Sequence, residues 1–379
     1  MTDVLSRDRS FASDNYAGAH QQVIDAVCAA NDGHARGYGD DPVTGRAIAA
    51  IQQAVGAPVA VGFVFNGTGA NVTALGLVLR PWQAVVCAAG AHIDSDEAGA
   101  PARLLGTTLL RVPTTDGRIT PAGVQAVWRR IGDEHAVQPT VVSITQSTEW
   151  GTCYALDDIA VLAEMVHERG GLLHIDGARL ANAAATLDCT LAATTFDAGA
   201  DLVSLGGTKN GLLGAEAVLA RPELAADLPW LRKSLGQLAS KHRFLAAQFE
   251  ALFTDELWRR SATHANAMAE RLHAGVRGVP GLRVTQPRQA NAVFAILSAP
   301  ARLRLQQEYA FYLWNDLTGE VRWMCAWDTH PADVDRFIAA IRVAVAADPL
   351  PVDQGTGLDV DQQAGLSAMG VGHPPGRPR

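Results

Sequence analysis

The sequence predicts an α/β fold in which a large domain with a mostly parallel central sheet precedes a smaller C-terminal α/β domain. From Val61 onward, short apolar runs alternate with amphipathic segments, a pattern typical of parallel strands covered by helices. A length of 379 residues exceeds one small core and favours two domains. We place the large domain at 11–255, the small domain at 256–348 and a tail that we expect to be disordered at 349–379.

The first elements flank glycine-rich loops. A helix is expected over 21–31, before the loop GHARGYGDDP, whose composition disfavours regular structure. An apolar strand ends at Phe65, where the loop FNGTGAN leads into a helix. The run VVCAA predicts the next strand, and His92 follows it.

The clearest strand–helix–strand unit begins with the buried-strand pattern TVVSIT at 140–145. A helix follows, with apolar residues at i, i+3, i+4 and i+7 from Ile159, a possible cap at Asp157 or Asp158, and an end at the Gly-Gly pair after residue 169. The runs LLHI and DLVSL predict two further strands, which end just before Asp176 and the sequence GGTK.

The C-terminal third predicts a smaller mixed unit. Helical segments are expected at 240–253 and 264–272. The runs LRVT, AVFAIL and VRWMCAW predict strands, and a last helix is expected over 333–345.

Composition excludes several classes of function. A net charge of −8 without a basic stripe argues against a nucleic-acid partner. No run of 18 apolar residues occurs and the N-terminus is polar, so we expect no membrane association and a cytoplasmic protein. Because no CxxC pair or metal-ligand spacing occurs, we expect no metal site and free thiols at all five cysteines, which are Cys28, Cys87, Cys153, Cys189 and Cys325.

Asp176 and Lys209 each follow a predicted strand of one sheet. The carboxyl ends of parallel strands meet at one edge, so both side chains can reach one pocket. Pyridoxal 5'-phosphate (PLP) needs a lysine amine for its Schiff base and a carboxylate at its pyridine nitrogen. Burial lowers the pKa of a lysine, which favours the neutral nucleophile. The two residues therefore predict a PLP site.

Two other segments fit the same cofactor. Backbone N–H groups and the Thr68 hydroxyl, next to Gly67, can hold a phosphate at a helix N-terminus, although the loop lacks the Walker A ending. The imidazole of His92 can stack on the cofactor ring. Taken alone, Gly67 and Thr68 are equally consistent with a tight turn, and Asp176 with the cap of a turn or helix. Lys209 alone is more typical of an exposed loop, and His174 of a structural histidine.

As an ordered set, ten motifs resemble the low-specificity L-threonine aldolases, PLP enzymes of fold type I in the β-eliminating lyase/threonine aldolase group. The motifs are FASDNYAG, ANDGHARGYGDD, FNGTGAN, AHIDSDEAGA, SITQSTEWGT, HIDGARLANA, SLGGTKNG, GQLASKHRFLAAQ, HANAMAERL and VRWMCAWDT. The resemblance implies cleavage of L-threonine, L-allo-threonine or a related β-hydroxy-α-amino acid to glycine and an aldehyde. It also implies a homotetramer built as a dimer of dimers.

The resemblance further implies roles for individual residues. Lys209 forms the Schiff base, Asp176 pairs with the pyridine nitrogen, and Arg179 contacts the phenolic oxygen or the substrate carboxylate. The remaining implied contacts are Ser13 and Arg322 at that carboxylate, Gly67 and Thr68 at the phosphate, His92 over the ring, and Lys241 at a neighbouring subunit's phosphate. Apart from the resemblance, we predict Tyr38 as a substrate-binding residue, with contact to the cofactor or closure of its own loop as the alternatives.

One departure from the group leaves the proton acceptor open. Many members have a histidine where this chain has Glu149, in the sequence QSTE. His92, Glu149 or a water held by them can be the base.

Alternative functions differ in how well the sequence supports them. β-Elimination, racemisation and glycine transfer to an unusual aldehyde require the same lysine and aspartate. A dinucleotide-binding oxidoreductase lacks its GxGxxG loop, and retention of Lys209, Asp176 and both arginines argues against a non-catalytic binding protein. Arg322 alone is equally consistent with packing on Trp323 or Trp327.

Overall fold

A seven-stranded sheet forms the centre of the large domain in the computed structural model, which describes residues 10–350. The strand order is β1-β7-β6-β5-β4-β2-β3, and β7 alone runs antiparallel to its neighbours in this sheet. The strands are β1 (Ala60–Val64), β2 (Gln83–Ala88), β3 (Thr108–Val112), β4 (Gln138–Thr145), β5 (Leu172–Gly177), β6 (Leu202–Leu205) and β7 (Glu216–Ala220). The predicted, mostly parallel sheet is confirmed.

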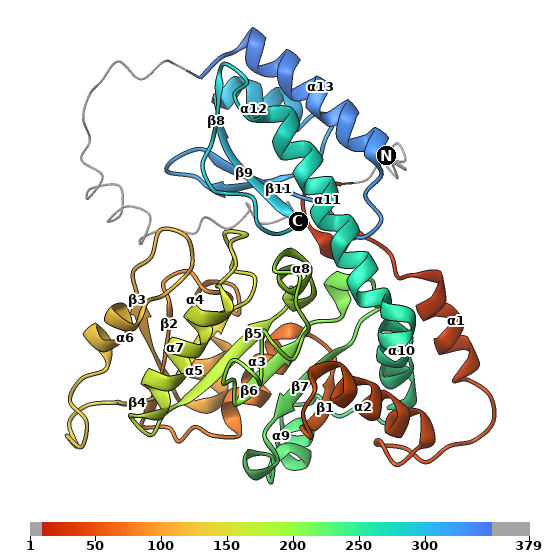
Figure 1. Ribbon diagram of the computed structural model, residues 1–379, viewed down its shortest axis with the longest axis vertical. Coiled ribbons are helices and arrows are strands. Elements are labelled where there is room, and N and C mark those ends of the chain that lie inside the picture. Colours follow the sequence, from red (N-terminus) through yellow and green to blue (C-terminus); the bar gives the residue numbers. More distant parts are fainter. Residues whose placement is uncertain (1–9, 351–379) are drawn as a thin grey trace.

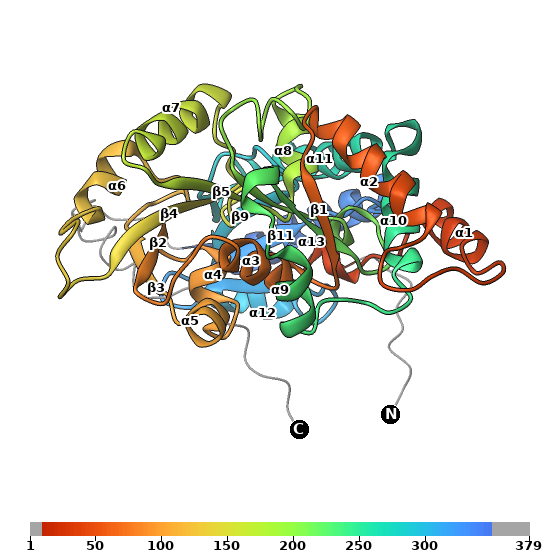
Figure 2. The same ribbon diagram turned by 90° about the horizontal axis from the view of Figure 1, so that it is seen from below.

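Helices cover both faces of this sheet, as Figure 2 shows. One layer contains α3, α5 and α9, and α7, α8 and α2 lie on the opposite side. Because helices cover both faces of the sheet, β6 and β7 are buried along their whole length. The helices are α1 (Gln21–Ala29), α2 (Pro42–Val55), α3 (Gly67–Gly76), α4 (His92–Ser95), α5 (Ala100–Leu105), α6 (Pro121–Val127), α7 (Leu156–His167), α8 (Leu180–Thr186), α9 (Leu228–Ser234) and α10 (Arg243–Phe253).

The smaller domain is an antiparallel sheet packed against helices, above the large domain in Figure 1. Its strand order is β10-β11-β9-β8. The elements are α11 (Leu257–Val276), β8 (Leu282–Val284), β9 (Ala292–Leu297), α12 (Ala299–Leu305), β10 (Tyr312–Asn315), β11 (Glu320–Met324) and α13 (Pro331–Ala347).

Two segments connect the domains. Helix α11 starts in the large hydrophobic core with Leu257 and Trp258 and ends in the small one with Leu272 and Val276. Phe11 is fully buried in the small-domain core, although the chain then enters the large domain. The core of the small domain therefore includes the N-terminal segment.

Some local expectations were wrong. Neither Asp157 nor Asp158 caps α7, because Ala155 is its N-cap residue and no side chain caps it; the two aspartates lie in the first turn, where they favour the helix dipole. Lys241 lies in a turn and not in a helix, since α10 begins at Arg243. The expected helix at 264–272 is part of the longer α11.

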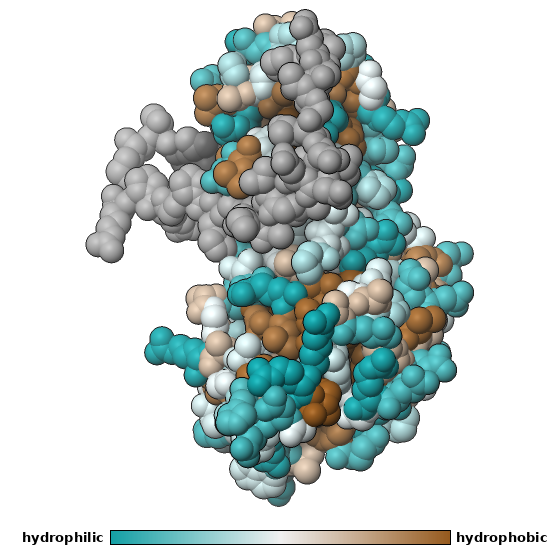
Figure 3. Space-filling model, turned by 90° about the vertical axis from the view of Figure 1, so that its left-hand side faces the viewer, coloured by the Kyte–Doolittle hydropathy of each residue, from teal (hydrophilic) through white to brown (hydrophobic). Residues whose placement is uncertain are grey.

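The cysteines, the surface and the C-terminal tail were also subjects of prediction. All five cysteines are free thiols. Within residues 10–350, no helix combines the length and apolar character needed to cross a membrane. Hydrophilic side chains dominate the face shown in Figure 3, with apolar side chains among them, as on most globular proteins. Nearly all of the expected tail, 351–379, lies outside the described residues.

Candidate active site

The carboxyl ends of four parallel strands bring four of the expected residues to one edge of the large sheet. His92 follows β2, Glu149 follows β4, Asp176 lies near the end of β5, and Lys209 follows β6. The strand register places Asp176 opposite Thr145 of β4 and Ser204 of β6. This is the edge at which open α/β sheets bind ligands.

Lys209 differs from the other two lysines of the chain. It is half-buried, whereas Lys233 and Lys241 are exposed. Its loop lies close to the end of β5, because a Cβ at Gly206 would come within 2.4 Å of the Ala178 carbonyl oxygen. Burial and the charge of Arg179 lower the pKa of Lys209, which favours a neutral, nucleophilic amine.

Asp176 is a buried carboxylate with hydrogen-bonding capacity to spare. Its Oδ1 accepts the Ala178 N–H at 3.0 Å, and its Oδ2 accepts Asn71 Nδ2 at 2.8 Å. Burial works to raise the pKa of Asp176, but the charge of His92 and the Asn71 hydrogen bond outweigh it, so the pKa lies below 3.8. An ionised carboxylate that can accept a further bond suits a protonated pyridine nitrogen.

Two acidic residues hold His92. Its backbone N–H donates to Glu149 Oε1 at 2.8 Å, and its ring Nδ1 lies 2.8 Å from Glu97 Oε1. Burial works to lower the pKa of His92, but the Glu97 hydrogen bond and the charge of Asp176 raise it above 6.5. Burial and the charge of Asp176 raise the pKa of Glu149.

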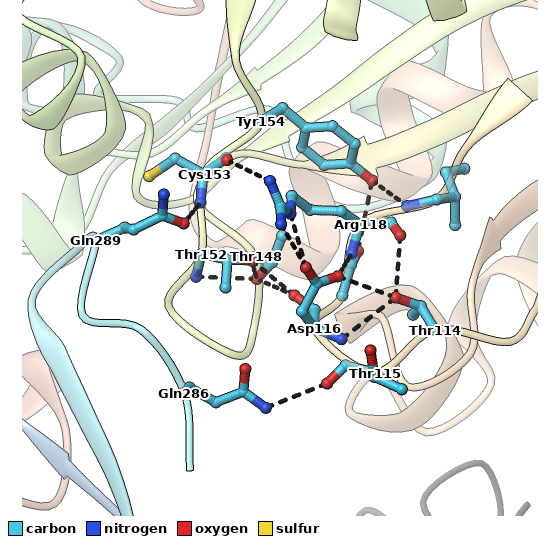
Figure 4. A network of polar contacts seen from close by, with 12 residues as sticks. Thr114, Thr115, Asp116, Arg118, Thr148, Thr152, Cys153, Tyr154, Gln286 and Gln289 are labelled. Atoms are coloured by element: carbon cyan, nitrogen blue, oxygen red, sulfur yellow. Dashed lines mark hydrogen bonds and ion pairs between the residues drawn. The ribbon is translucent and has the colours of Figure 1, made fainter. Parts of the chain in front are cut away.

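The loop that carries Glu149 is fixed by the polar network in Figure 4. The hydroxyls of Thr148 and Thr152 both donate to the Asp116 carbonyl oxygen, at 3.1 and 2.6 Å. Downstream, the Cys153 N–H donates to Gln289 Oε1 at 3.0 Å, which connects the loop to the small domain. Because these bonds flank Glu149, its position is set by both domains.

Arg179 forms an ion pair that was not predicted from the sequence. Its Nε and Nη2 donate to the two carboxylate oxygens of Asp14, at 2.7 and 2.8 Å. The Asp14 side chain is 1% exposed and also accepts Asn291 Nδ2 at 3.1 Å. Asp14 therefore occupies N–H groups of Arg179 at Nε and Nη2, and only the remaining N–H groups of the guanidinium can bind a ligand.

Arg322 differs from Arg179 in its partners. Among residues 10–350, no carboxylate forms an ion pair with it, and its Nε is buried without a hydrogen-bond acceptor. Its guanidinium carbon lies 4.6 Å from the ring centroid of Trp314 and 5.8 Å from that of Tyr312, not over Trp323 or Trp327. Burial and the charge of Arg179 lower its pKa to about 10, so it remains charged at neutral pH and suits a carboxylate ligand.

The start of α3 provides the expected phosphate site. The Asn66 side chain caps the helix by accepting the Gly69 N–H at 2.8 Å, and Gly67 and Thr68 form the first turn. Gln237 lies over this turn, since its Oε1 accepts the Phe65 N–H at 3.0 Å. A Cβ at Gly69 would come within 2.4 Å of the amide end of the Gln237 side chain, so a larger residue there would require Gln237 to move.

The remaining expected residues lie beside Asp14, on the surface of the large domain, and inside the large sheet. Ser13 is buried and caps the turn that contains Asp14, by accepting the Asn15 N–H at 3.2 Å. Tyr38 is 56% exposed, and its N–H donates to the Ser240 carbonyl oxygen, next to the exposed Lys241. Tyr38 and Lys241 are thus adjacent to each other on the surface. His174 is buried between Ser143 and Ser204, as a structural histidine would be.

The residues at this edge fit PLP. They provide one half-buried amine at Lys209, one buried carboxylate at Asp176, and a helix N-terminus for a phosphate at Gly67. Buried polar atoms without partners among residues 10–350 also lie on residues of this site, and they include Asn71 Oδ1, Glu97 Oε2, Glu149 Oε2 and Arg322 Nε. Such atoms are costly unless a ligand or water satisfies them.

Comparison with known proteins places this site in a family. Residues 10–300 match the family model described as beta-eliminating lyase. The chain belongs to the beta-eliminating lyase family. Beta-eliminating lyases and threonine aldolases depend on PLP, and this chain is therefore a PLP-dependent enzyme.

Curated relatives and solved structures agree with the family. The chain is 41% identical to a low specificity L-threonine aldolase of a Pseudomonas species and 40% identical to that of Pseudomonas aeruginosa, each over 92% of this chain and 100% of the relative. A threonine aldolase structure from Leishmania major matches with a TM-score of 0.84 and 31% identity, over 88% of this chain and 99% of that one. YbdL from Escherichia coli, described with a methionine aminotransferase function, has a TM-score of 0.68 at 12% identity and shares the fold. The expected fold type I is confirmed.

Four residues of this beta-eliminating lyase site were missed from the sequence: Asp14, Asn71, Glu97 and Gln237. All four lie inside the ten motifs given above, in FASDNYAG, FNGTGAN, AHIDSDEAGA and GQLASKHRFLAAQ, within five residues of a residue that was singled out. A buried polar residue beside a candidate ligand residue was the available signal. Nothing in the spacing indicated which partner each would bind.

Proposed function

We propose that this enzyme cleaves L-threonine, L-allo-threonine or a related β-hydroxy-α-amino acid to glycine and an aldehyde, and catalyses the reverse aldol addition. The main support is that Lys209 and Asp176 lie at the same edge of the large sheet. The chain also matches threonine aldolases over nearly its whole length. PLP, when bound, supplies the ring that accepts the electron pair of the broken Cα–Cβ bond. Lys209 provides its amine anchor, and Asp176 keeps its ring nitrogen protonated.

Residues of both domains hold the substrate. Arg322 of β11 binds the substrate carboxylate, with Ser13 and the free donors of Arg179 beside it. Fixing the carboxylate turns the Cα–Cβ bond toward the orientation in which it breaks. Because the Arg322 Nε is buried and no carboxylate among residues 10–350 pairs with the guanidinium, little rearrangement precedes binding.

The β-hydroxyl proton needs an acceptor. We assign this role to His92, whose Nδ1 is already engaged by Glu97, so that Nε2 is the nitrogen left for substrate. Glu149 binds the His92 backbone through Oε1 and presents its unpartnered Oε2 as the second candidate.

An assay of the PLP-loaded protein with L-threonine tests the function. We expect stoichiometric acetaldehyde and glycine, together with a change in the visible absorbance when glycine is added. A yellow protein that releases no aldehyde would instead favour another fold type I reaction, such as β-elimination, racemisation or glycine transfer. A protein that takes up no PLP would contradict the proposal.

Arg322→Gln is expected to raise the KM for threonine by roughly 10- to 150-fold with a smaller effect on kcat. The loss of a charge-assisted hydrogen bond is worth about 1.5–3 kcal/mol, and each 1.36 kcal/mol is tenfold. Steady-state kinetics measure the effect, with Arg322→Lys as a variant that keeps the charge. Arg283→Gln, on the exposed side of β8 in the same sheet, is the control and should leave KM unchanged.

We also propose a homotetramer, built as a dimer of dimers, in the cytoplasm. An exposed Tyr38 next to an exposed Lys241 supports completion of a neighbouring subunit's site by this surface. Five free thiols are consistent with a reducing compartment. Light scattering of the PLP-loaded protein tests the assembly, and a monomer with full activity would contradict it.

A further inference from the structure

Glu97 is a buried carboxylate that contacts two members of the active site. It lies five residues after His92, and its side chain is fully buried. Its Oε1 is 2.8 Å from His92 Nδ1 and 2.7 Å from Asn71 Nδ2. A buried carboxylate is costly unless donors compensate it. Both bonds engage Oε1, whereas Oε2 is buried without a partner among residues 10–350, so Glu97 is held in place through Oε1 alone.

Asn71 extends the contact to the cofactor site. Its Nδ2 carries two hydrogens, one for Glu97 Oε1 and one for Asp176 Oδ2 at 2.8 Å. With the opposite orientation of the Asn71 amide, Oδ1 would face two carboxylates and be repelled by both. The orientation with Nδ2 toward Glu97 and Asp176 is therefore the favoured one. His92, Glu97, Asn71 and Asp176 therefore form one continuous chain of hydrogen bonds.

We propose that Glu97 is a positioning residue that keeps the proton of neutral His92 on Nδ1, leaves Nε2 as the proton acceptor, and holds the Asn71 amide against Asp176. The proposal rests on the proposed function, in which His92 takes the β-hydroxyl proton. A neutral imidazole has one donor and one acceptor nitrogen, and the acidic partner selects which is which. Glu97 touches neither substrate nor cofactor and acts through the two residues that do.

The charges around His92 set the direction of its pH dependence. Glu97 and Asp176 favour its protonated form, whereas Lys209 opposes it, and Glu149 contacts its backbone N–H. Removing the Glu97 charge lowers the pKa of His92. Because a base must be neutral, activity would then persist to lower pH, while the weaker base would turn over more slowly.

Glu97→Gln in the PLP-loaded enzyme is the first test. We expect kcat to fall about 10- to 100-fold, which is less than the roughly 10²- to 10⁴-fold attributed to a general base itself, because Glu97 acts through His92. The acid limb of the pH profile should move to lower pH. In a His92→Asn background the same change should have less than about a twofold further effect, because coupled residues are not additive. The control is Asp94→Asn, a nearby carboxylate that pairs with Arg111 and not with His92.

A second readout does not depend on turnover. In PLP-free protein, the ¹H–¹⁵N ring spectrum of His92, assigned by its loss in His92→Asn, should show a protonated Nδ1 that becomes mixed between the two nitrogens in Glu97→Gln. An unchanged ring spectrum and pH profile in Glu97→Gln would overturn the proposal. If the wild type releases no aldehyde but shows the Nδ1 signature and its loss in Glu97→Gln, the proposed function fails while the tautomer assignment stands.

Discussion

Replacing Lys209 with alanine is expected to abolish threonine cleavage and the visible absorbance of bound PLP. Lys209 is the one half-buried lysine of three, and its amine has a lowered pKa, so neither Lys233 nor Lys241 can substitute for it at the sheet edge. Loss of the covalent anchor should cost at least about 10³-fold in kcat, or roughly 4 kcal/mol in the barrier. Absorbance spectra and acetaldehyde release measure the two effects.

The matched control is Lys233→Ala, which removes an exposed lysine from the end of α9. It should keep both the absorbance band and PLP uptake. Retention of the band in Lys209→Ala together with its loss in Lys233→Ala would reverse the assignment.

Much of the large domain could be predicted because local pattern and tertiary position agree there. The run at 140–145 is apolar and β-branched, which predicts a buried strand, and β4 includes this run. Once strands β5 and β6 are parallel neighbours, Asp176 near the end of β5 and Lys209 after β6 must lie at the same edge. The direction of β7 was not predictable, because hydrophobic periodicity carries no information on strand direction.

The contacts that orient the site were not predictable for a different reason. Asp14 and Arg179 are far apart in sequence, and they meet only because the N-terminal segment pairs with the small-domain sheet. The Phe11 N–H donates to the Ala310 carbonyl oxygen, and the Met324 N–H donates to that of Phe11. No spacing rule links these three segments. The sequence could therefore name the ligand residues but not the residues that hold them.

The Asp14–Arg179 pair has the largest expected effect on stability. Asp14→Asn removes one partner of a buried pair and leaves the Arg179 charge uncompensated, which costs about 3–5 kcal/mol. Urea unfolding of the wild type and variant at neutral pH measures the difference. We also expect a higher KM for threonine, because Arg179 loses the contact that fixes its orientation.

The pH dependence of this difference has a definite sign. Burial works to raise the pKa of Asp14, but the charge of Arg179 and its hydrogen bonds outweigh burial, so the pKa of the folded state lies below 3.8. A carboxyl with a lowered pKa contributes stability above its unfolded pKa and loses it as pH falls through the folded pKa. The difference in the free energy of unfolding between wild type and Asp14→Asn should therefore be largest at neutral pH and should decrease below pH 3.8.

A surface pair of the same geometry provides the control. Arg271 donates to both oxygens of Asp335 at 2.6 and 2.7 Å, but the two side chains are about half exposed. Solvent screens such pairs, so Asp335→Asn should change the free energy of unfolding far less than Asp14→Asn. Equal losses in the two variants would mean that burial does not strengthen the Asp14–Arg179 pair.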